Sequence, residues 1–445
     1  MHTLNDLKAG KLVGQTRVKI ACGLSEFPDE LFDLAETLEV LDLSGNRLHS
    51  LPDKFASFKK LRILFLSDNE FDVLPEVLGQ CPQLSMVGFK ANRIASVPAS
   101  SLPKMLRWLI LTDNRIEALP DSIGDCRPLQ KLMLAGNQLK SLPRAMAQCV
   151  NLQLLRISAN QIDELPDWLF SMPKLSWLAF AGNPCCCHSR ADQALEEIHW
   201  NELHVNELLG EGASGLISKA YWQDHHDVAV KVFKGAITSD GLPADEMAAS
   251  IAAGQHDNLV EVLGQLVGHP QEKSGLLLSL IADDFKNLAG PPSLDSCTRD
   301  VYSSACAFTL QEVDTLITGI ASAAAHLHER SIMHGDLYGH NILVNDRAEC
   351  LLGDFGAATF YGEQSPLISA ALERLEVRAF GCLLEELLQR VTEPDDMGSS
   401  PVILSLQALL TDCMSKTPSQ RPSFSTIYGV LLSLRLDRSR VLSSA

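Results

Sequence analysis

Two short segments near the C-terminal end, HGDLYGHN (334–341) and GDFG (353–356), carry the clearest chemical signal in the sequence. Asp336 and Asn341 are five residues apart in the first segment, and Asp354 follows thirteen residues after Asn341. Two bound magnesium ions and a triphosphate require polar ligands with this kind of spacing, together with one carboxylate that orients the attacking hydroxyl. The three side chains can supply these roles, so the spacing predicts phosphoryl transfer.

The length and composition limit the class of protein. A chain of 445 residues is too long for one ordinary core, so two or three domains are expected. No apolar run is long enough to span a bilayer, and the N-terminus lacks the apolar stretch of a signal peptide. Twelve cysteines, scattered along so long a chain, are typical of a reduced, cytoplasmic protein.

The net charge of −18 belongs almost wholly to the C-terminal part. Residues 1–190 hold 21 Lys and Arg against 20 Asp and Glu, whereas the remainder holds 16 against 35. A field of this sign argues against nucleic acid or an anionic membrane as the main partner. A bound triphosphate would therefore depend on local cations.

A repeated frame fills the first two-fifths of the chain. Copies such as LQKLMLAGNQLKSLP (129–143) place an asparagine every 22 or 23 residues, at positions 46, 69, 92, 114, 137, 160 and 183. Each copy predicts a short strand, a turn at the Asn and a return segment, and its leucines become buried only when copies stack. The Asn side chain can bond backbone groups of adjoining turns. The frame resembles a leucine-rich repeat, so residues 1–190 are expected to form an α/β repeat solenoid shaped like a horseshoe, with residues 12–28 as its N-terminal cap.

Side chains between the buried leucines of each strand face the concave side of such a solenoid. Trp108 and Trp177 share one column with Ile63, and Phe65 lies in the next column. A patch of large apolar side chains usually marks a binding surface. These four residues are therefore candidate contacts for a protein substrate or regulator, or for the chain's own C-terminal domain. The alternative is that they only cover one another.

Residues 191–203 are predicted to link the repeats to a second domain. Just before them, Cys185, Cys186, Cys187 and His188 raise the question of a metal site. Consecutive cysteines cannot easily reach one tetrahedral ion, and no second Cys or His cluster lies nearby. A capping turn after the last repeat is therefore favoured over zinc.

The C-terminal part opens with a glycine string that is followed by a strand ending in a lysine. LGEGASGLI (209–217) precedes VAVK (228–231), and the glycines would let a backbone approach phosphates. A dinucleotide-binding fold uses a similar string, but it needs a βαβ unit with a distal acid, and here a lysine follows instead. Together with the two loops described first, these motifs resemble a protein kinase over residues 204–437, which leaves 438–445 as a tail.

The resemblance implies a bilobal α+β fold, ATP as a substrate and a role for each motif. Lys231 would contact the α- and β-phosphates while Glu246, or alternatively Asp245, holds its ammonium group. Asp336 would accept or orient the proton of the substrate hydroxyl. Asn341 and Asp354 would bind Mg²⁺ or Mn²⁺. The remaining nucleotide-binding residues would be Gly210, Glu211, Gly212, Gly215, Ile217 and Ala229.

The catalytic loop departs from the kinase pattern at three positions. Gly335 replaces the arginine that often precedes the catalytic aspartate, and Tyr338 stands where serine/threonine kinases carry a lysine that contacts phosphate. His340 stands where many tyrosine kinases carry an arginine. Neither subclass signature is present, and activation through loop phosphorylation is not expected.

A second departure follows the GDFG segment. The stretch from Asp354 to Glu376 is short and contains no A-P-E motif, whose glutamate in the family pairs with a late arginine, here Arg421. Glu376 itself stands where the following helix normally carries an aspartate. The sequence therefore leaves the surface that docks a protein substrate undefined.

These features support three functional hypotheses. Lys231, Glu246, Asp336, Asn341 and Asp354 are all present, which favours an ATP-dependent kinase acting on Ser or Thr, and less favourably Tyr, with the repeats as a binding or regulatory module. The missing lysine keeps open a pseudokinase scaffold that binds nucleotide and partners without turnover. The missing docking segment keeps open a kinase-like enzyme that acts on a small molecule.

Overall fold

A computed structural model describes residues 2–186, 196–212, 214–223, 226–235, 237–238, 240–362, 364–392 and 401–444. The chain divides into two compact units. The N-terminal unit comprises Met1–Leu175 and Gly182–Cys185, and the C-terminal unit comprises Ser176–Ala181 and Cys186–Ala445. No helix within the described ranges is both long and apolar enough to cross a bilayer. Cys187 and His188, considered above for a zinc site, lie outside the described residues.

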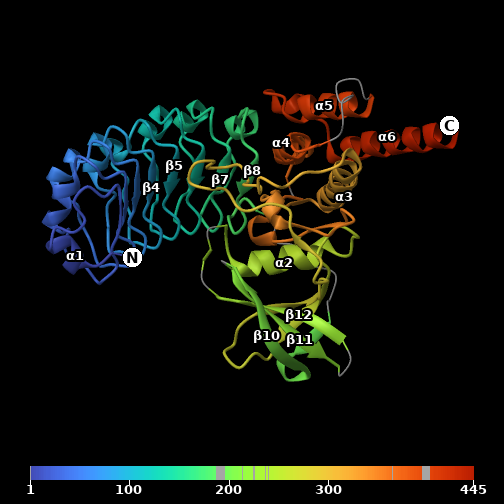
Figure 1. The fold of residues 1–445 in the computed structure, drawn as a ribbon, viewed down its shortest axis with the longest axis horizontal. Coiled ribbons are helices and arrows are strands. Elements are labelled where there is room, and N and C mark those ends of the chain that lie inside the picture. The colour runs from blue at the N-terminus through green and yellow to red at the C-terminus, as the bar shows by residue number, and fades with distance from the viewer. Residues whose placement is uncertain are drawn as a thin grey trace. The chain divides into compact units, whose positions relative to one another are not determined.

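Short parallel strands, each three residues long, form the sheet of the N-terminal unit (Figure 1). Each strand pairs in register with the next, so residues at the same place in successive repeats lie side by side. The strands are β1 (Arg17–Lys19), β2 (Val40–Asp42), β3 (Ile63–Phe65), β4 (Met86–Gly88), β5 (Trp108–Ile110), β6 (Lys131–Met133) and β7 (Leu154–Arg156). A short helix, α1 (Leu4–Lys8), precedes them.

The return segments of the repeats are 3-10 helices, which are compact enough for a 23-residue period. Each of η2 to η7 begins directly after a proline, which follows a leucine in every case except η4, where it follows Val97, and that proline has φ between −60° and −73°. Proline fixes φ in this range and suits the residue just before a helix. The elements are η1 (Asp29–Leu34), η2 (Asp53–Ser57), η3 (Glu76–Gln80), η4 (Ala99–Ser101), η5 (Asp121–Asp125), η6 (Arg144–Gln148) and η7 (Asp167–Ser171).

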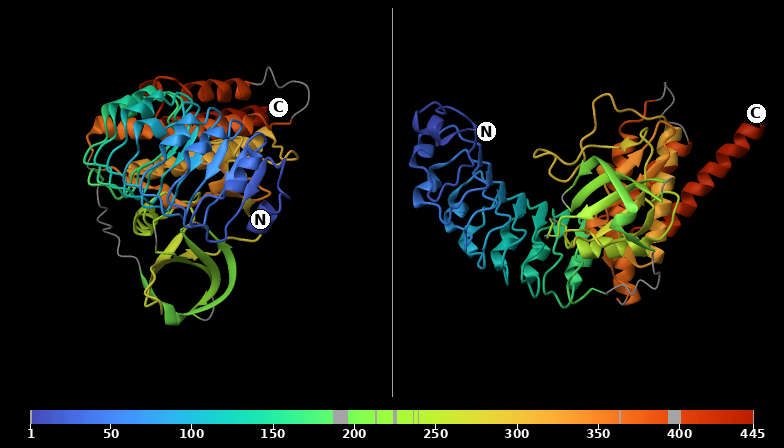
Figure 2. Two further views of the ribbon diagram at one scale, coloured as in Figure 1. Left: turned by 90° about the vertical axis from the view of Figure 1, so that its left-hand side faces the viewer. Right: turned by 90° about the horizontal axis from the view of Figure 1, so that it is seen from below.

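Buried asparagines tie each turn to the preceding one. The amide of Asn137 donates to the carbonyl oxygens of Leu134 in its own repeat and Leu111 in the preceding repeat, both at 2.9 Å. Its oxygen accepts the N–H of Ile116 at 3.0 Å. Asn69 and Asn160 repeat the pattern. The predicted solenoid is confirmed, and Figure 2 shows its curved course.

The C-terminal unit begins with a strongly curved, mostly antiparallel sheet (Figure 2). Its strand order is β10-β11-β12-β14-β13-β9, and only β9 pairs parallel to its neighbour. Helix α2 (Pro243–Ala253) lies between β12 and β13 in the chain. The strands are β9 (Glu197–His199), β10 (Leu203–Glu211), β11 (Gly215–Trp222), β12 (His226–Phe233), β13 (Val262–Val267) and β14 (Gly275–Ser279).

The rest of the C-terminal unit is mainly helical. Helix α3 (Leu310–Glu329) starts at a capping box formed by Thr309 and Glu312, and α4 (Pro366–Leu388) starts at Ser365 with a proline in its first turn. Both are strong helix-start signals. Helix α3 packs against α4 and α6 (Phe424–Ser444). The remaining helices are α5 (Pro401–Cys413), η8 (Trp200–Glu202), η9 (Gly339–Asn341), η10 (Phe355–Ala357) and η12 (Pro418–Gln420).

Short strands frame the loops that carry the predicted chemistry. β17 (Ile342–Val344) pairs with both β15 (Lys286–Asn287) and β18 (Cys350–Leu352). β16 (Ile332–Met333) pairs with β19 (Thr359–Phe360). The loop from 334 to 341 therefore leaves β16 and enters β17, and the GDFG segment leaves β18 and enters β19. These pairings hold both loops at fixed ends.

The observed boundaries differ from those predicted at three places. Residues 197–199, assigned to the linker, form β9 because they pair with β13. Residues 438–444, assigned to a tail, continue α6. Ser176–Ala181, which contains β8 (Trp177–Ala179), groups with the C-terminal unit although its sequence follows the repeat frame. The repeat pattern reports local backbone shape and cannot report which core a segment joins.

Candidate active site

The glycine string forms the hairpin between β10 and β11. A Cβ added to Gly210 or Gly212 would meet nothing within 4 Å, so this part of the backbone is open to an approaching ligand. A Cβ at Gly215 would lie 2.6 Å from the carbonyl oxygen of Val232, so this glycine is required for packing against β12. The three glycines thus serve two purposes, access and close strand contact.

Lys231 and Glu246 form a buried ion pair between β12 and α2. Their side chains are 13% and 3% exposed. Burial raises the pKa of Glu246 above its ordinary value, the charge of Lys231 acts in the opposite direction, and Asp354 adds to the rise. Of the two acidic residues considered from the sequence, Glu246 contacts Lys231 in this structure.

Asp336 and Asn341 lie together in the loop between β16 and β17. The amide of Asn341 donates to both the backbone carbonyl and the carboxylate of Asp336, each at 2.9 Å. The backbone carbonyl of Asn341 accepts the N–H of Gly353 at 3.0 Å, which joins this loop to the GDFG segment. Asp354 has φ of +54° and accepts the N–H of Gly356, so its backbone turns sharply at the predicted metal ligand.

A cleft of about 690 Å³ is lined by most of these side chains, and Asp336, which is not part of the lining, bonds Asn341, which is. Its lining includes Gly210, Lys231, Glu246, Asn341 and Asp354, and also Ile217 and Ala229. Carboxylate and amide oxygens are the ligands that Mg²⁺ prefers, and the lysine and open glycine backbone suit phosphates. The side chains that line the cleft therefore fit a metal-bound nucleotide.

Glu211 is placed differently from the other predicted nucleotide contacts. Its carboxylate pairs with Lys234 at 2.6 Å, on an exposed part of the hairpin, and it is not among the residues that line the cleft. The ammonium group of Lys234 holds the Glu211 carboxylate, whereas the neighbouring Gly210 and Gly212 line the cleft.

Comparison with known proteins assigns both parts of the chain. The protein tyrosine and serine/threonine kinase family matches residues 203–378, and the leucine-rich repeat family matches residues 24–94, 104–162 and 127–184. The chain combines leucine-rich repeats with a protein kinase domain.

Individual relatives of the kinase domain are distant. Ephrin type-B receptor 4b of Danio rerio is 26% identical over 53% of this chain and 27% of its own length. Serine/threonine-protein kinase ppk23 of Schizosaccharomyces pombe is 27% identical over 41% of this chain and 44% of its own.

A solved leucine-rich repeat protein of Leptospira interrogans is 26% identical, with a TM-score of 0.38, over 40% of this chain and 45% of that chain. The chain thus spans less than half the length of these relatives.

Glu376 of α4 accepts hydrogen bonds from the backbone of the loop from 334 to 341, the predicted catalytic loop. Its two oxygens accept the N–H groups of His334 at 3.1 Å and Gly335 at 2.5 Å, and one also bonds Nε2 of His328 at 2.8 Å. Burial alone would raise the pKa of Glu376, but the bonds and charges around it lower the pKa below its ordinary value. The glutamate that replaces an aspartate in the sequence thus contacts the catalytic loop directly.

His334 and Arg421 make backbone contacts inside the kinase domain. Nε2 of His334 lies 2.9 Å from the carbonyl oxygen of Gly353, and Nδ1 accepts the N–H of Asp336 at 3.3 Å. Arg421 is 1% exposed and donates to the carbonyl oxygens of Ser415 and Arg374. Burial lowers the pKa of Arg421 to about 10. Carbonyl oxygens therefore contact the arginine whose family partner is absent from the sequence.

Gly335 adopts a conformation that disfavours the expected arginine. Its φ is +74°, and an added Cβ would lie 2.5 Å from the carbonyl oxygen of Ala357 and 2.7 Å from that of Leu178. Both the backbone angle and the close approach of two carbonyl groups require glycine. The missing arginine is thus a consequence of local packing.

Asp300 was not identified from the sequence, although it contacts the catalytic loop. One carboxylate oxygen accepts the backbone N–H of His340 at 3.1 Å, and the other lies 2.7 Å from its Nδ1. Burial of His340 tends to lower its pKa, but the bond and charge of Asp300 raise it above the ordinary value. The two residues are 40 positions apart, and no motif in the sequence links them.

The predicted contact residues of the repeats fall into two groups. Ile63 and Trp108 do align in one column, with Met86 between them, and Lys131 lies next with its Nζ 4.4 Å from the indole centre of Trp108. Phe65 lies against Gly88, the next residue in its own column. Trp177, in contrast, is 1% exposed and contacts the kinase catalytic loop within the C-terminal unit.

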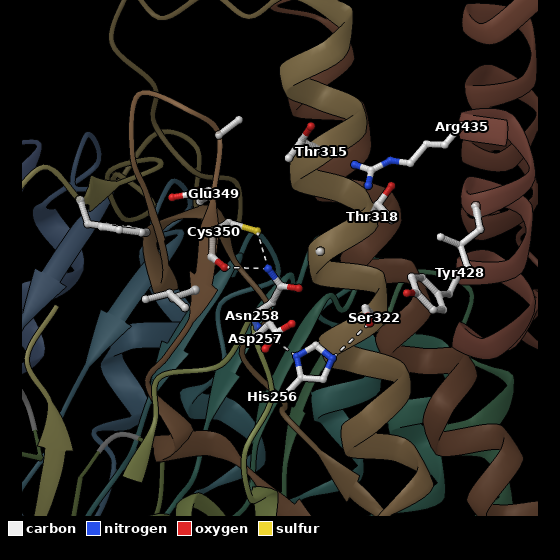
Figure 3. Close-up of a pocket in the computed structure, with 15 residues that line it drawn as sticks. His256, Asp257, Asn258, Thr315, Thr318, Ser322, Glu349, Cys350, Tyr428 and Arg435 are labelled. Carbon is white, nitrogen blue, oxygen red and sulfur yellow. Dashed lines mark hydrogen bonds between the residues drawn. The ribbon is translucent and has the colours of Figure 1, made fainter. Parts of the chain in front are cut away.

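A second cavity, of about 490 Å³, lies between α3, α6 and the β17–β18 hairpin (Figure 3). Nε2 of His256 lies 3.1 Å from the Ser322 hydroxyl, and Asn258 donates to the carbonyl oxygen of Cys350 at 3.0 Å. Arg435 pairs with Asp314 at 3.0 Å. Burial raises the pKa of the Cys350 thiol to about 12, which makes it unreactive. None of the predicted site residues that the structure describes lines this cavity, whereas Lys231, Glu246, Asn341 and Asp354 line the larger cleft.

Proposed function

We propose that this protein is an ATP-dependent protein kinase that transfers the γ-phosphate to a Ser or Thr hydroxyl, and less readily to Tyr. One observation supports this most strongly: Lys231, Glu246, Asn341 and Asp354 line one cleft, and Asp336 bonds Asn341 at its edge. Phosphoryl transfer depends mainly on positioning and charge stabilisation. This set of residues offers both.

In the proposed reaction the acceptor oxygen forms a bond to the γ-phosphorus. The bond from that phosphorus to the bridging oxygen breaks, its electron pair stays on ADP, and the acceptor proton passes to the Asp336 carboxylate. Lys231, oriented by Glu246, binds the α- and β-phosphates, while Asn341 and Asp354 hold the metal. Bound Mg²⁺ or Mn²⁺ supplies charge neutralisation at the phosphates.

The decisive experiment measures transfer of γ-labelled phosphate from ATP to the protein itself and to mixed Ser, Thr and Tyr peptides. Asp336→Asn should reduce the rate by about 10²–10⁴, the usual contribution of a positioned acid–base group. Asp346→Asn makes the same chemical change at an exposed turn outside the cleft and should leave the rate unchanged. Equal transfer by wild type and Asp336→Asn would reject the proposal.

A pseudokinase scaffold remains the second candidate because Tyr338, at the position of the expected lysine, is only 4% exposed. That side chain brings no cation to the phosphates. Mg²⁺ and ATP that raise the melting temperature of the wild type, without any transfer, would favour the scaffold. Preferential labelling of the Tyr peptides would contradict the proposed preference for Ser and Thr and would assign the tyrosine hydroxyl as the acceptor.

The repeats are proposed to bind a protein substrate or regulator through two neighbouring concave columns, one with Ile63 and Trp108 and the next with Phe65. A charged residue in such an apolar patch should abolish binding, because its desolvation is costly. Proteins captured by the full chain should be lost with Trp108→Asp and retained with Trp168→Asp, which changes an indole on a return segment. Retention by both variants would show that the column only packs.

The protein is proposed to work in the cytoplasm. Cys81, Cys126 and Cys149 are free thiols inside the repeats, and burial raises the pKa of each, that of Cys149 to about 11. Thiols persist in a reducing compartment. Rapid alkylation of unfolded protein from fresh cells should label these cysteines, whereas labelling only after reduction would contradict this location.

A further inference from the structure

The indole of Trp177 contacts the two residues that directly follow Asp336. It stacks on the ring of Tyr338, with ring centroids 4.2 Å apart and planes within 6° of parallel. Its Nε1 donates to the backbone carbonyl of Leu337 at 3.0 Å. Trp177 and Tyr338 are 1% and 4% exposed. One side chain therefore holds both the backbone and a side chain of the catalytic loop in a place from which water is excluded.

The neighbours of Trp177 extend this contact on both sides of the loop. The carbonyl of Leu178 passes so close to Gly335 that a Cβ there would lie 2.7 Å away. The N–H of Phe180 lies 3.4 Å from the hydroxyl of Thr359, which follows the GDFG segment. Ser176–Ala181 thus contacts the residue before Asp336, the residues after it, and the strand that follows Asp354.

The departure of Tyr338 from the kinase pattern has a structural consequence here. A lysine at this position would send a flexible cation toward phosphate, but the tyrosine ring is fixed between Trp177 and the ring of His340, whose centroid is 4.9 Å away. The loop from Asp336 to Asn341 is therefore packed through the ring of Tyr338 against the indole of Trp177. Its position depends on a segment that lies 160 residues earlier in the chain.

We propose that Trp177 is a positioning residue for phosphoryl transfer, and that it acts through Leu337 and Tyr338 to hold Asp336 at the cleft. The proposal rests on the proposed kinase function. A displacement of about 1 Å at a reacting group can reduce a rate by about 10²-fold. Lys231, Glu246 and the glycine hairpin lie on other elements, so ATP binding should be affected much less than transfer.

The test compares the full chain with Trp177→Ala, which removes both contacts, and Trp177→Phe, which keeps a ring but loses the N–H donor. Trp177→Ala should lower kcat about 10²-fold, with KM for ATP within about twofold of wild type. The kcat of Trp177→Phe should lie between that of wild type and that of Trp177→Ala. Trp168→Ala is the matched control on a repeat return segment and should match wild type.

Amide hydrogen exchange separates positioning from general stability, because it reports local opening. In Trp177→Ala, exchange in residues 335–341 should rise at least about tenfold, while α3, α4 and β10–β12 stay protected. Unchanged exchange and kinetics in Trp177→Ala would overturn the proposal, and so would a uniform rise across the whole kinase domain. If wild type transfers no phosphate, the kinase function fails by itself. The exchange pattern then still decides whether Trp177 holds the loop.

Discussion

The repeat unit and the kinase domain both use buried polar side chains to fix backbone, but they arrange them in opposite ways. In the repeats, Asn69, Asn137 and Asn160 make the same three kinds of bond, one repeat after another. In the kinase domain, Glu376 bonds the start of the loop from 334 to 341 and Asp300 bonds its end, and neither set of bonds is repeated elsewhere in the periodic manner of the asparagines. The backbone of the repeats is therefore stabilised by many equivalent hydrogen bonds, whereas the position of the catalytic loop depends on a few different residues.

The largest expected contrast uses two glycines with the same backbone angle. Gly335 and Gly45 both have φ of +74°, but the nearest atom to an added Cβ is 2.5 Å away at Gly335 and 3.9 Å away at Gly45. Gly45→Ala should cost about 1–2 kcal/mol from the left-handed conformation alone. Gly335→Ala adds an overpacking cost of about 1–3 kcal/mol. Chemical denaturation of both variants measures the difference, and equal losses would contradict the crowding described at the catalytic loop.

A somewhat smaller effect, with a pH signature, is expected for Glu376→Gln. An amide can replace only part of the three bonds that the carboxylate accepts, so the free energy of unfolding should fall by about 2–3 kcal/mol at neutral pH. The folded-state pKa of Glu376 lies below its ordinary value of 4.5. Its contribution is therefore complete above the ordinary pKa and is lost as the pH falls through the lowered one.

Unfolding curves of wild type and Glu376→Gln, measured from pH 7 to pH 3, test this sign. The gap between the two proteins should stay constant down to about pH 5 and then narrow. A gap that widens on acidification would mean that the carboxylate is bound in its protonated form, against the contacts described.

The smallest expected effect concerns one step of the asparagine ladder. Asn137→Ala leaves two carbonyl groups and one N–H without their partner and should cost about 1–3 kcal/mol. Asn151→Ala is the control: this half-buried side chain loses one bond to the carbonyl of Arg127 and one from the ammonium group of Lys174, and leaves no buried backbone group unpaired, so the loss should stay at about 0.5–1 kcal/mol. Similar losses of unfolding free energy in the two variants would show that burial does not strengthen the contribution of the repeat asparagines.

The same contrast explains what the sequence could predict. Periodicity located the repeats, their register and the buried asparagines, because each error would have to recur in every copy. Motif spacing located Lys231, Asn341 and Asp354, which all line the cleft. Motif spacing did not indicate that the Glu211 carboxylate pairs with Lys234 and does not line the cleft, because that ion pair joins two separate parts of the chain. Contacts between distant segments, such as Asp300 with His340 and Trp177 with Tyr338, leave no local pattern in the sequence because folding alone brings the two residues of each pair together.

Single-turnover transfer from γ-labelled ATP tests the central claim most directly, using Asp336→Asn, Lys231→Met and the double variant. Residues that act as one unit show strongly non-additive losses. The account predicts that each single variant loses about 10²-fold or more, and that the double variant is slower than the worse single one by no more than about tenfold. A wild-type rate no higher than that of the double variant would contradict the assignment of this cleft to phosphoryl transfer.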